Sequence, residues 1–218
     1  SISFAIAPRL NAAGRMDSAV SALQLLLCED EGRAQQLTDQ LVASNTARQE
    51  AEQRIMAEAE AQLAADPARQ NDRVILVWGQ DYHPGVIGIV ASRLVEHYGK
   101  PVMVISVQNG EGKGSGRSVP DLLLRFGGHA LAAGLSVKEE NIPALRKALN
   151  EFAAREYPVL ESPPLELDVT VRLDALTVQE VEGLDYLAPC GNGNPAPLFL
   201  LENAQIEGVY PVSDGRHC

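Results

Sequence analysis

The sequence lacks the residue patterns of several protein classes. Its 218 residues include only three cysteines, Cys28, Cys190 and Cys218, and none of them forms a CxxC pair. We therefore expect neither a disulfide framework nor a cysteine-held zinc site, and this cysteine usage fits a reducing cytoplasm. No apolar run reaches the length of about 18 residues that a transmembrane helix needs, so we expect no membrane span.

Familiar metal and nucleotide motifs are also missing. The sequence has no HxxxH, no DxD, no Walker-type lysine and no GxGxxG spacing, and Asp17 and Asp214 are isolated. A hydrolytic metal site built only from these residues is not expected. The chain starts without methionine or the basic start of a signal peptide, and residues 213–218 stop just after a turn signal. We expect both ends to be cut.

Negative charge dominates the composition but not the middle of the chain. The formal net charge is −11, and acidic residues outnumber basic ones nine to three in residues 29–66 and eleven to four in residues 139–187. Residues 84–136, in contrast, contain five basic and three acidic residues. We interpret the acidic stretches as solvated helix faces, whereas the locally basic middle can bind phosphate.

Apolar spacing and chain breakers predict a mixed α/β protein. We expect an irregular segment over residues 1–16, a short helix ending at Cys28 and a long, largely exposed helix over residues 30–65. Buried strands at 73–79 and 101–107, with a helix at 85–97 between them, predict a right-handed crossover and a parallel pair. The remaining expected elements are a turn at 109–110, an extended segment at 113–118, a strand or helix start at 130–137, a helix at 142–154, a linker at 158–164, a strand at 165–171, a helix at 178–187, a rigid loop at 190–197 and strands at 198–201 and 204–210.

The most informative stretch carries small residues around an arginine and a histidine. Residues 113–118 are KGSGRS, and residues 125–134 are RFGGHALAAG. Glycine lets backbone amides approach a ligand, while serine and arginine donate hydrogen bonds to phosphate oxygens. The pattern predicts a phosphate or nucleotide pocket, and the alternative is that His129 is a buried structural histidine. The pocket residues would be Ser115, Gly116, Arg117, Ser118, Gly127, Gly128 and His129.

Two further motifs place polar residues beside small ones. In residues 8–15, PRLNAAGR, a backbone turn could present Arg15 and Asn11 to a phosphate, or the arginines could be solvated at a helix entry. In residues 82–92, His83 and a glycine begin a helix, and helix N-termini attract anions. The alternative for this second motif is a glycine turn into a packed helix, with a further glycine that allows close contact with the sheet.

The motifs PRLNAAGR, HPGVIGIVAS, GSGRS, GGHALAAG and GNGNP occur in this order, and the set resembles the RecJ family of DHH phosphoesterases over essentially the whole chain. This resemblance implies an α/β architecture in four parts. Residues 1–28 would end a DHH catalytic domain, and residues 29–71 would form a long connecting helix. Residues 72–156 would form a small α/β DHH-associated domain, and residues 160–218 would begin an OB-fold domain that is incomplete here.

The resemblance also implies a function. Members of this family are single-strand-specific 5′→3′ DNA exonucleases of repair and recombination that use Mn²⁺ or Mg²⁺, held by Asp and His motifs that would precede this chain. By carry-over, Arg15 and His129 are candidate catalytic residues, with Arg15 reaching the scissile phosphate and His129 lying against the terminal nucleotide. Candidate substrate-binding residues are Asn11, His83, Ser115, Gly116, Arg117, Ser118, Gly127 and Gly128. Single-stranded DNA is the expected partner, and a single-strand binding protein and a RecQ-type helicase are further candidates.

The sequence departs from the family pattern in two places. Relatives carry a longer insert after Ser118, so either this protein has a deletion or a stretch is missing from the sequence, and the second reading is favoured. Cys190 stands where an aromatic residue is usual, which weakens a stacking role there. Two alternative functions stay open: a non-catalytic single-stranded nucleic-acid-binding module, and a DHH phosphodiesterase that acts on short RNA or cyclic dinucleotides.

Overall fold

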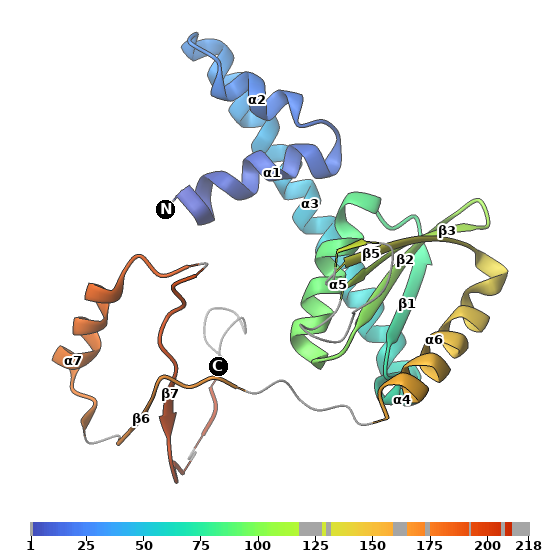
Figure 1. The fold of residues 1–218 in the computed structure, drawn as a ribbon. Coiled ribbons are helices and arrows are strands. Elements are labelled where there is room, and N and C mark those ends of the chain that lie inside the picture. Colours follow the sequence, from blue (N-terminus) through green and yellow to red (C-terminus); the bar gives the residue numbers. More distant parts are fainter. Residues whose placement is uncertain are drawn as a thin grey trace. The chain divides into compact units, whose positions relative to one another are not determined.

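The computed structural model describes most of the chain as two separate units. The described residues are 2–117, 128–129, 132–158, 165–172, 175–191, 193–205 and 208–210. The first unit spans residues 1–163 and the second spans residues 164–218, so the division lies beside the prolines of the expected linker (Figure 1). No helix in the described part of the chain is long and apolar enough to cross a membrane.

The first unit begins with helices, which corrects the expectation of an irregular segment over residues 1–16. A π-helical turn, Ile2–Ile6, leads into α1, Ala7–Met16, and α2 follows at Val20–Leu26. Pro8 does not break α1 because it lies in the first turn, where a backbone N–H has no partner within the helix. The expected short helix is therefore present as α2, but it ends before Cys28.

The expected long helix is confirmed as α3, Glu31–Ala65, which begins at the side-chain cap of Asp30. Figure 1 shows α1 and α2 beside one half of α3 and the sheet beside the other half. The buried residues of α3 follow this division. Leu41 packs with α1 and α2, whereas Ile55 and Leu63 join the core of the α/β part. One helix thus connects two separate apolar clusters.

A five-stranded sheet of order β1-β2-β3-β5-β4 forms the centre of the α/β part. β1 and β2 are parallel, which confirms the crossover expected through α5, and the other pairs are antiparallel. Asn109 and Gly110 have positive φ angles of 52° and 77° and form the predicted turn between β2 and β3. The elements are β1 Ile75–Gln80, α5 Pro84–Tyr98, β2 Val102–Gln108, β3 Glu111–Arg117, β4 Gly128–His129, β5 Ala132–Lys138 and α6 Ile142–Glu156.

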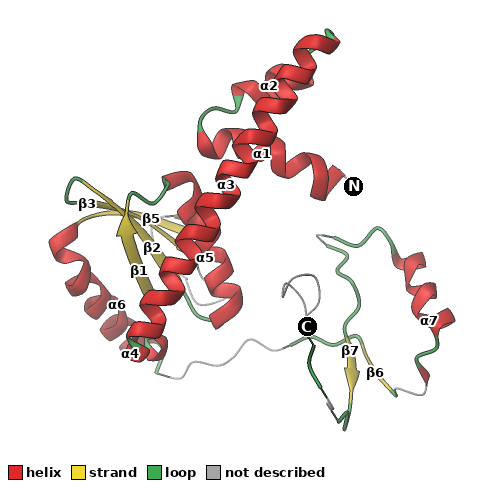
Figure 2. Ribbon diagram, turned by 180° about the vertical axis from the view of Figure 1, so that it is seen from behind, coloured by secondary structure: helices red, strands yellow, loops and turns green. Residues whose placement is uncertain are grey.

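Two apolar cores lie on opposite faces of this sheet. On one face, Val77 and Val104 pack with residues of α3 and α5. On the other face, Leu76 and Ile105 pack with α6, beginning at Ile142 (Figure 2). Burial of each such side chain contributes about 1.5–3 kcal/mol. Because alternate residues of β1 and β2 enter the two cores, both strands appear in the sequence as continuous apolar runs.

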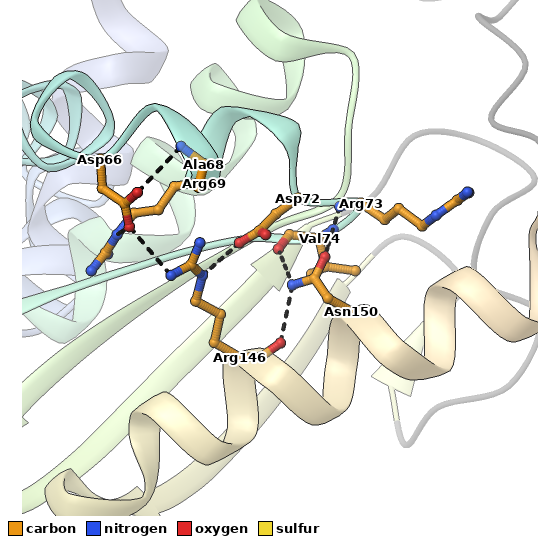
Figure 3. Close-up of polar contacts among 8 residues, drawn as sticks. All are labelled: Asp66, Ala68, Arg69, Asp72, Arg73, Val74, Arg146 and Asn150. Carbon is orange, nitrogen blue, oxygen red and sulfur yellow. Dashed lines mark hydrogen bonds and ion pairs between the residues drawn. The ribbon is translucent and has the colours of Figure 1, made fainter.

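The start of β1 is held to α6 by polar contacts (Figure 3). Asn150 of α6 accepts hydrogen bonds from the backbone N–H groups of Arg73 and Val74, at 2.7 and 3.0 Å, and donates to the carbonyl oxygens of Val74 and Arg146, both at 3.0 Å. Arg146 also forms an ion pair with Asp72, with 2.5 Å between Nε and Oδ2. A single amide thus bonds to four backbone groups, three in the segment that leads into β1 and one on α6.

The second unit has fewer regular elements in its described part. β6, Val169–Val171, pairs in parallel with β7, Phe199–Leu201, and α7, Val178–Gly183, lies between them in sequence. Thr177 and Glu180 form a capping box at α7, and the backbone and side-chain hydrogen bonds from Thr177 lower the pKa of Glu180. The strand expected at 165–171 is therefore shorter, and residues 204–205 and 208–210 do not form the expected strand.

We predict that Asn150→Ala lowers the free energy of unfolding by about 2–4 kcal/mol, because it leaves several backbone groups without partners in a half-buried place. Urea unfolding followed by the fluorescence of Trp78, the single tryptophan, measures this. Glu151→Ala is the control, since the neighbouring Glu151 has only a surface ion pair of 3.7 Å. Equal unfolding midpoints for the two variants would contradict the prediction.

Candidate functional site

The start of α5 is fixed by contacts with the sheet. Ser106 of β2 donates a hydrogen bond of 2.5 Å to the carbonyl oxygen of Tyr82, and the ring of Tyr82 is fully buried against Gly79. Burial, with the nearby Glu58 as a second cause, raises the pKa of Tyr82 well above its ordinary value. The side chain therefore stays neutral and packed, and together with the Ser106 hydrogen bond it holds the loop before α5 against the sheet.

His83 is the cap of α5. Its Nδ1 accepts a hydrogen bond of 3.1 Å from the backbone N–H of Gly85. Because Nδ1 is an acceptor, the proton of a neutral imidazole lies on Nε2, which is left as the donor. The prediction that His83 begins a helix is confirmed, and its predicted substrate contact would have to use Nε2.

Arg15 lies against the same helix start. Its Nη1 is 3.4 Å from the carbonyl oxygen of Gly85, and its own backbone approaches so closely that a methyl group at Gly85 would lie 1.9 Å from the Arg15 carbonyl oxygen. Asn11 is exposed one turn earlier on α1, at the spacing that places two residues on one helix face. The end of α1 therefore brings Arg15 to the first turn of α5.

Arg117, at the end of β3, reaches the next turn of α5. Its Nη1 donates to the Ser115 Oγ at 2.9 Å and to the Gly116 carbonyl oxygen at 2.7 Å. A methyl group at Gly88 would lie 2.8 Å from Arg117 Nη2 and 3.2 Å from Ser115 Oγ. Gly88 follows Gly85 by three residues, so Arg15 and Arg117 contact neighbouring positions on one face of α5.

The three glycines of β3, Gly112, Gly114 and Gly116, leave space for core side chains of the sheet. A methyl group added at Gly112 would lie 2.8 Å from the Ile105 side chain. Added at Gly114 it would lie 3.1 Å from Leu135, and added at Gly116 it would lie 3.4 Å from Met103. These apolar side chains belong to the α6 face of the sheet. The glycines therefore leave room for core side chains. The extended segment expected from residue 113 is confirmed as β3, a strand inside the sheet.

The other residues of β3 lie on the opposite face, together with small residues of β5. Lys113, Ser115 and Arg117 alternate with the glycines. In the antiparallel register, Ser115 is opposite Gly134 and Arg117 is opposite Ala132, and directly opposite residues share a face. Gly134 is exposed. This face therefore offers cationic and hydroxyl groups beside a flat area of small residues.

The backbone of the glycine-histidine motif lies next to this area. Gly128 and His129 form β4, where His129 pairs with Ala132, the partner of Arg117. The backbone of His129 is thus in register with Arg117 across β5. The side chain of His129 is not described, and Ser118, Gly127 and the place of the expected insert lie outside the described residues.

A separate cavity of about 310 Å³ opens at the carboxyl end of β2. It is lined by Pro84, Ser106, Gln108, Asn109, Glu111 and Lys113. None of the predicted site residues lines it, although His83 directly precedes Pro84 in the chain. Of the described predicted residues, Arg15, His83, Ser115 and Arg117 instead lie at the first two turns of α5.

The described residues do not fit a metal centre. No group of three or more His, Cys, Asp or Glu side chains that could hold a metal ion occurs among them. The cationic groups of Arg15 and Arg117 are suited to anions. What this arrangement can do chemically is therefore to bind and orient a phosphate-bearing ligand.

An ionic cluster behind the site was not found from the sequence. Glu52 of α3 is only 3% exposed, yet it pairs with Arg48 of the same helix and with Arg93 of α5, at 2.6 Å between Arg93 Nε and Glu52 Oε1. Asn45 accepts a hydrogen bond of 3.2 Å from Arg48. A buried glutamate in a polar helix resembles its exposed neighbours in sequence, so only the spacing of the buried positions of α3 could have indicated it.

Comparison with known families matches both units of the chain. The DHHA1 domain model matches residues 71–155, and the RecJ OB domain model matches residues 167–218. The first match includes the whole sheet, α5 and α6. The second includes β6, α7 and β7.

The similar proteins and solved structures described here are all named RecJ. The single-stranded-DNA-specific exonuclease RecJ of Bacillus subtilis is 35% identical over 99% of this chain. A crystal structure of RecJ in complex with Mn²⁺ from Thermus thermophilus has a TM-score of 0.73 and 38% identity over 92% of the chain, and one with Mg²⁺ has a TM-score of 0.72 and 38% identity over 91%. The chain spans only 29% of the Bacillus protein and 31–32% of the two crystallised chains.

We predict that Glu52→Gln destabilises the first unit by about 1–3 kcal/mol. The change leaves the nearly buried Arg48 without a carboxylate, and the exposure of Arg93 keeps the loss below that of a fully buried pair. Urea unfolding measures the loss, with the exposed Glu50→Gln on the same helix as the control. If both variants unfold at the same urea concentration, Glu52 does not stabilise the contact between α3 and α5.

Proposed function

Because this chain belongs to the RecJ family, we propose that it is part of a metal-dependent exonuclease that removes nucleotides from the 5′ end of single-stranded DNA in repair and recombination. In this proposal the chain supplies the surface that captures the 5′ end. Mn²⁺ or Mg²⁺, with which the solved relatives were crystallised, would activate water for hydrolysis, and the ligands of the metal would lie in a part of the protein outside the described residues.

The observation that carries this proposal is the pair of arginines on one face of α5. Arg15 contacts Gly85 and Arg117 contacts Gly88, although they come from α1 and β3. Guanidinium groups bind phosphate oxygens through parallel charge-assisted hydrogen bonds. Two guanidinium groups at neighbouring turns of one helix can therefore hold the phosphates at the end of a strand.

Each residue has a distinct proposed part. Arg15 contacts the scissile phosphate, with Asn11 beside it on α1. Arg117 and Ser115 bind the 5′-terminal phosphate, and His129, whose backbone is in register with Arg117, lies against the terminal nucleotide. These groups bind and orient the strand, while the small residues of β5 leave room for it.

The cellular setting follows from the same family membership. We expect the protein to act in the cytoplasm on single-stranded DNA. A single-strand binding protein and a RecQ-type helicase are the proposed partners, because an exonuclease of this class needs an unpaired strand. The OB domain would add contacts to that strand, as such folds bind single-stranded nucleic acids.

We predict that the printed 218-residue chain, purified alone with Mn²⁺, does not degrade single-stranded DNA, whereas the full-length protein does. Gel analysis of a 3′-labelled oligonucleotide gives the direction of digestion and separates the two. Progressive 5′→3′ digestion by a clean preparation of the chain alone would overturn the division of labour proposed here.

We predict that Arg117→Ala in the full-length protein reduces the preference for a 5′-phosphate over a 5′-hydroxyl end about tenfold or more, which is the value of one charge-assisted hydrogen bond. Fluorescence anisotropy with both forms of one oligonucleotide measures this ratio. Lys147→Ala removes the same charge from the surface of α6 and should leave the ratio unchanged. An unchanged ratio for Arg117→Ala would remove the proposed role.

A further inference from the structure

We propose that Gly88 is a positioning residue for the phosphate site, because the absence of a side chain there creates the space in which the guanidinium of Arg117 lies. The inference rests on the proposed function of Arg117 as a ligand of the 5′-phosphate. Gly88 lies in the second turn of α5, where close packing on the sheet is the alternative role.

The space at Gly88 is filled by polar side-chain atoms. The three atoms closest to a methyl group at this position would be Arg117 Nη2 at 2.8 Å, Ser115 Oγ at 3.2 Å and Arg117 Cζ at 3.5 Å. None of these atoms belongs to the backbone of the sheet. If Gly88 served only to let α5 approach the sheet closely, backbone atoms of β2 or β3 would be among its nearest neighbours.

The same contacts orient the guanidinium. Arg117 Nη1 is occupied by Ser115 Oγ and by the Gly116 carbonyl oxygen, whereas among the described residues none accepts a hydrogen bond from Nη2. The face of α5 at Gly88 therefore lies against Nη2, the nitrogen that has no acceptor among the described residues. An arginine held by two hydrogen bonds and a close contact with α5 loses little conformational freedom when it binds a phosphate.

Gly85 provides a contrast on the same face of α5. A methyl group there would lie 1.9 Å from the carbonyl oxygen and 2.8 Å from the carbonyl carbon of Arg15, which are backbone atoms. An alanine at Gly85 would push α1 away from α5, whereas an alanine at Gly88 would displace only the end of a flexible side chain. The two glycines therefore have different roles: the first sets the distance between helices, and the second sets the position of one functional group.

The expected phenotype is a loss of recognition without a loss of stability. Alanine is a better helix former than glycine, so Gly88→Ala should unfold at the same or a slightly higher temperature. At the same time, the displaced guanidinium should reduce the preference for a 5′-phosphate over a 5′-hydroxyl end. A residue that only maintained the fold would give the opposite result.

The test uses the full-length protein and one oligodeoxynucleotide with either a 5′-phosphate or a 5′-hydroxyl. We expect Gly88→Ala to reduce the ratio of the two affinities at least fivefold in fluorescence anisotropy, with an unchanged or raised melting temperature. Gly32→Ala is the matched control in α3, because a methyl group there would meet only Asp30 Oδ1 at 3.6 Å. It should leave the ratio unchanged.

A double variant separates this inference from the proposed function. If Gly88 acts through Arg117, then Gly88→Ala combined with Arg117→Ala should lower the ratio no further than Arg117→Ala alone. A normal ratio for Gly88→Ala beside a reduced ratio for Arg117→Ala would overturn the inference and leave the function intact. If neither variant changes the ratio, the proposed function itself fails.

Discussion

The position of α5 is the constraint on which the candidate site depends. Its buried residues, among them Val86, Val90 and Leu94, fix the helix to the sheet and to α3, while Ser106 holds the loop that precedes it. Every described part of the site is then placed with respect to this helix. Arg15 arrives from a different helix and Arg117 from a strand, and α5 contacts both.

The α/β part could be predicted from the sequence to a large extent because its signals are local. Two apolar runs on either side of an amphipathic segment indicated β1, α5 and β2, and Asn109-Gly110 indicated the turn into β3. The first helix was not predicted, because proline and glycine such as Pro8 and Gly14 usually interrupt helices. Proline is tolerated in a first turn, and the surrounding alanines are good helix formers, so α1 forms in spite of both residues.

The sequence suggested residues for the candidate site but not how their side chains are arranged. It predicted a phosphate pocket from Arg117 and the glycines of an extended segment, without assigning each residue to a face of the sheet. In the structure the glycines at 112, 114 and 116 lie under Ile105, Leu135 and Met103, on the face opposite to Arg117. The side chains that lie over a glycine depend on how its strand pairs within the sheet. This pairing involves residues distant in sequence, so it cannot be predicted from local composition. The burial of Glu52 depends in the same way on the neighbouring α5.

The alternation along β3 separates two kinds of evolutionary change. Positions 112, 114 and 116 are constrained by the volume of the core, so almost any replacement there would disturb packing. Positions 113, 115 and 117 carry none of the apolar core and can be exchanged without repacking it. Substitutions at every second residue of β3 could thus change which DNA ends the protein accepts. Each such substitution would change the free energy of unfolding only slightly.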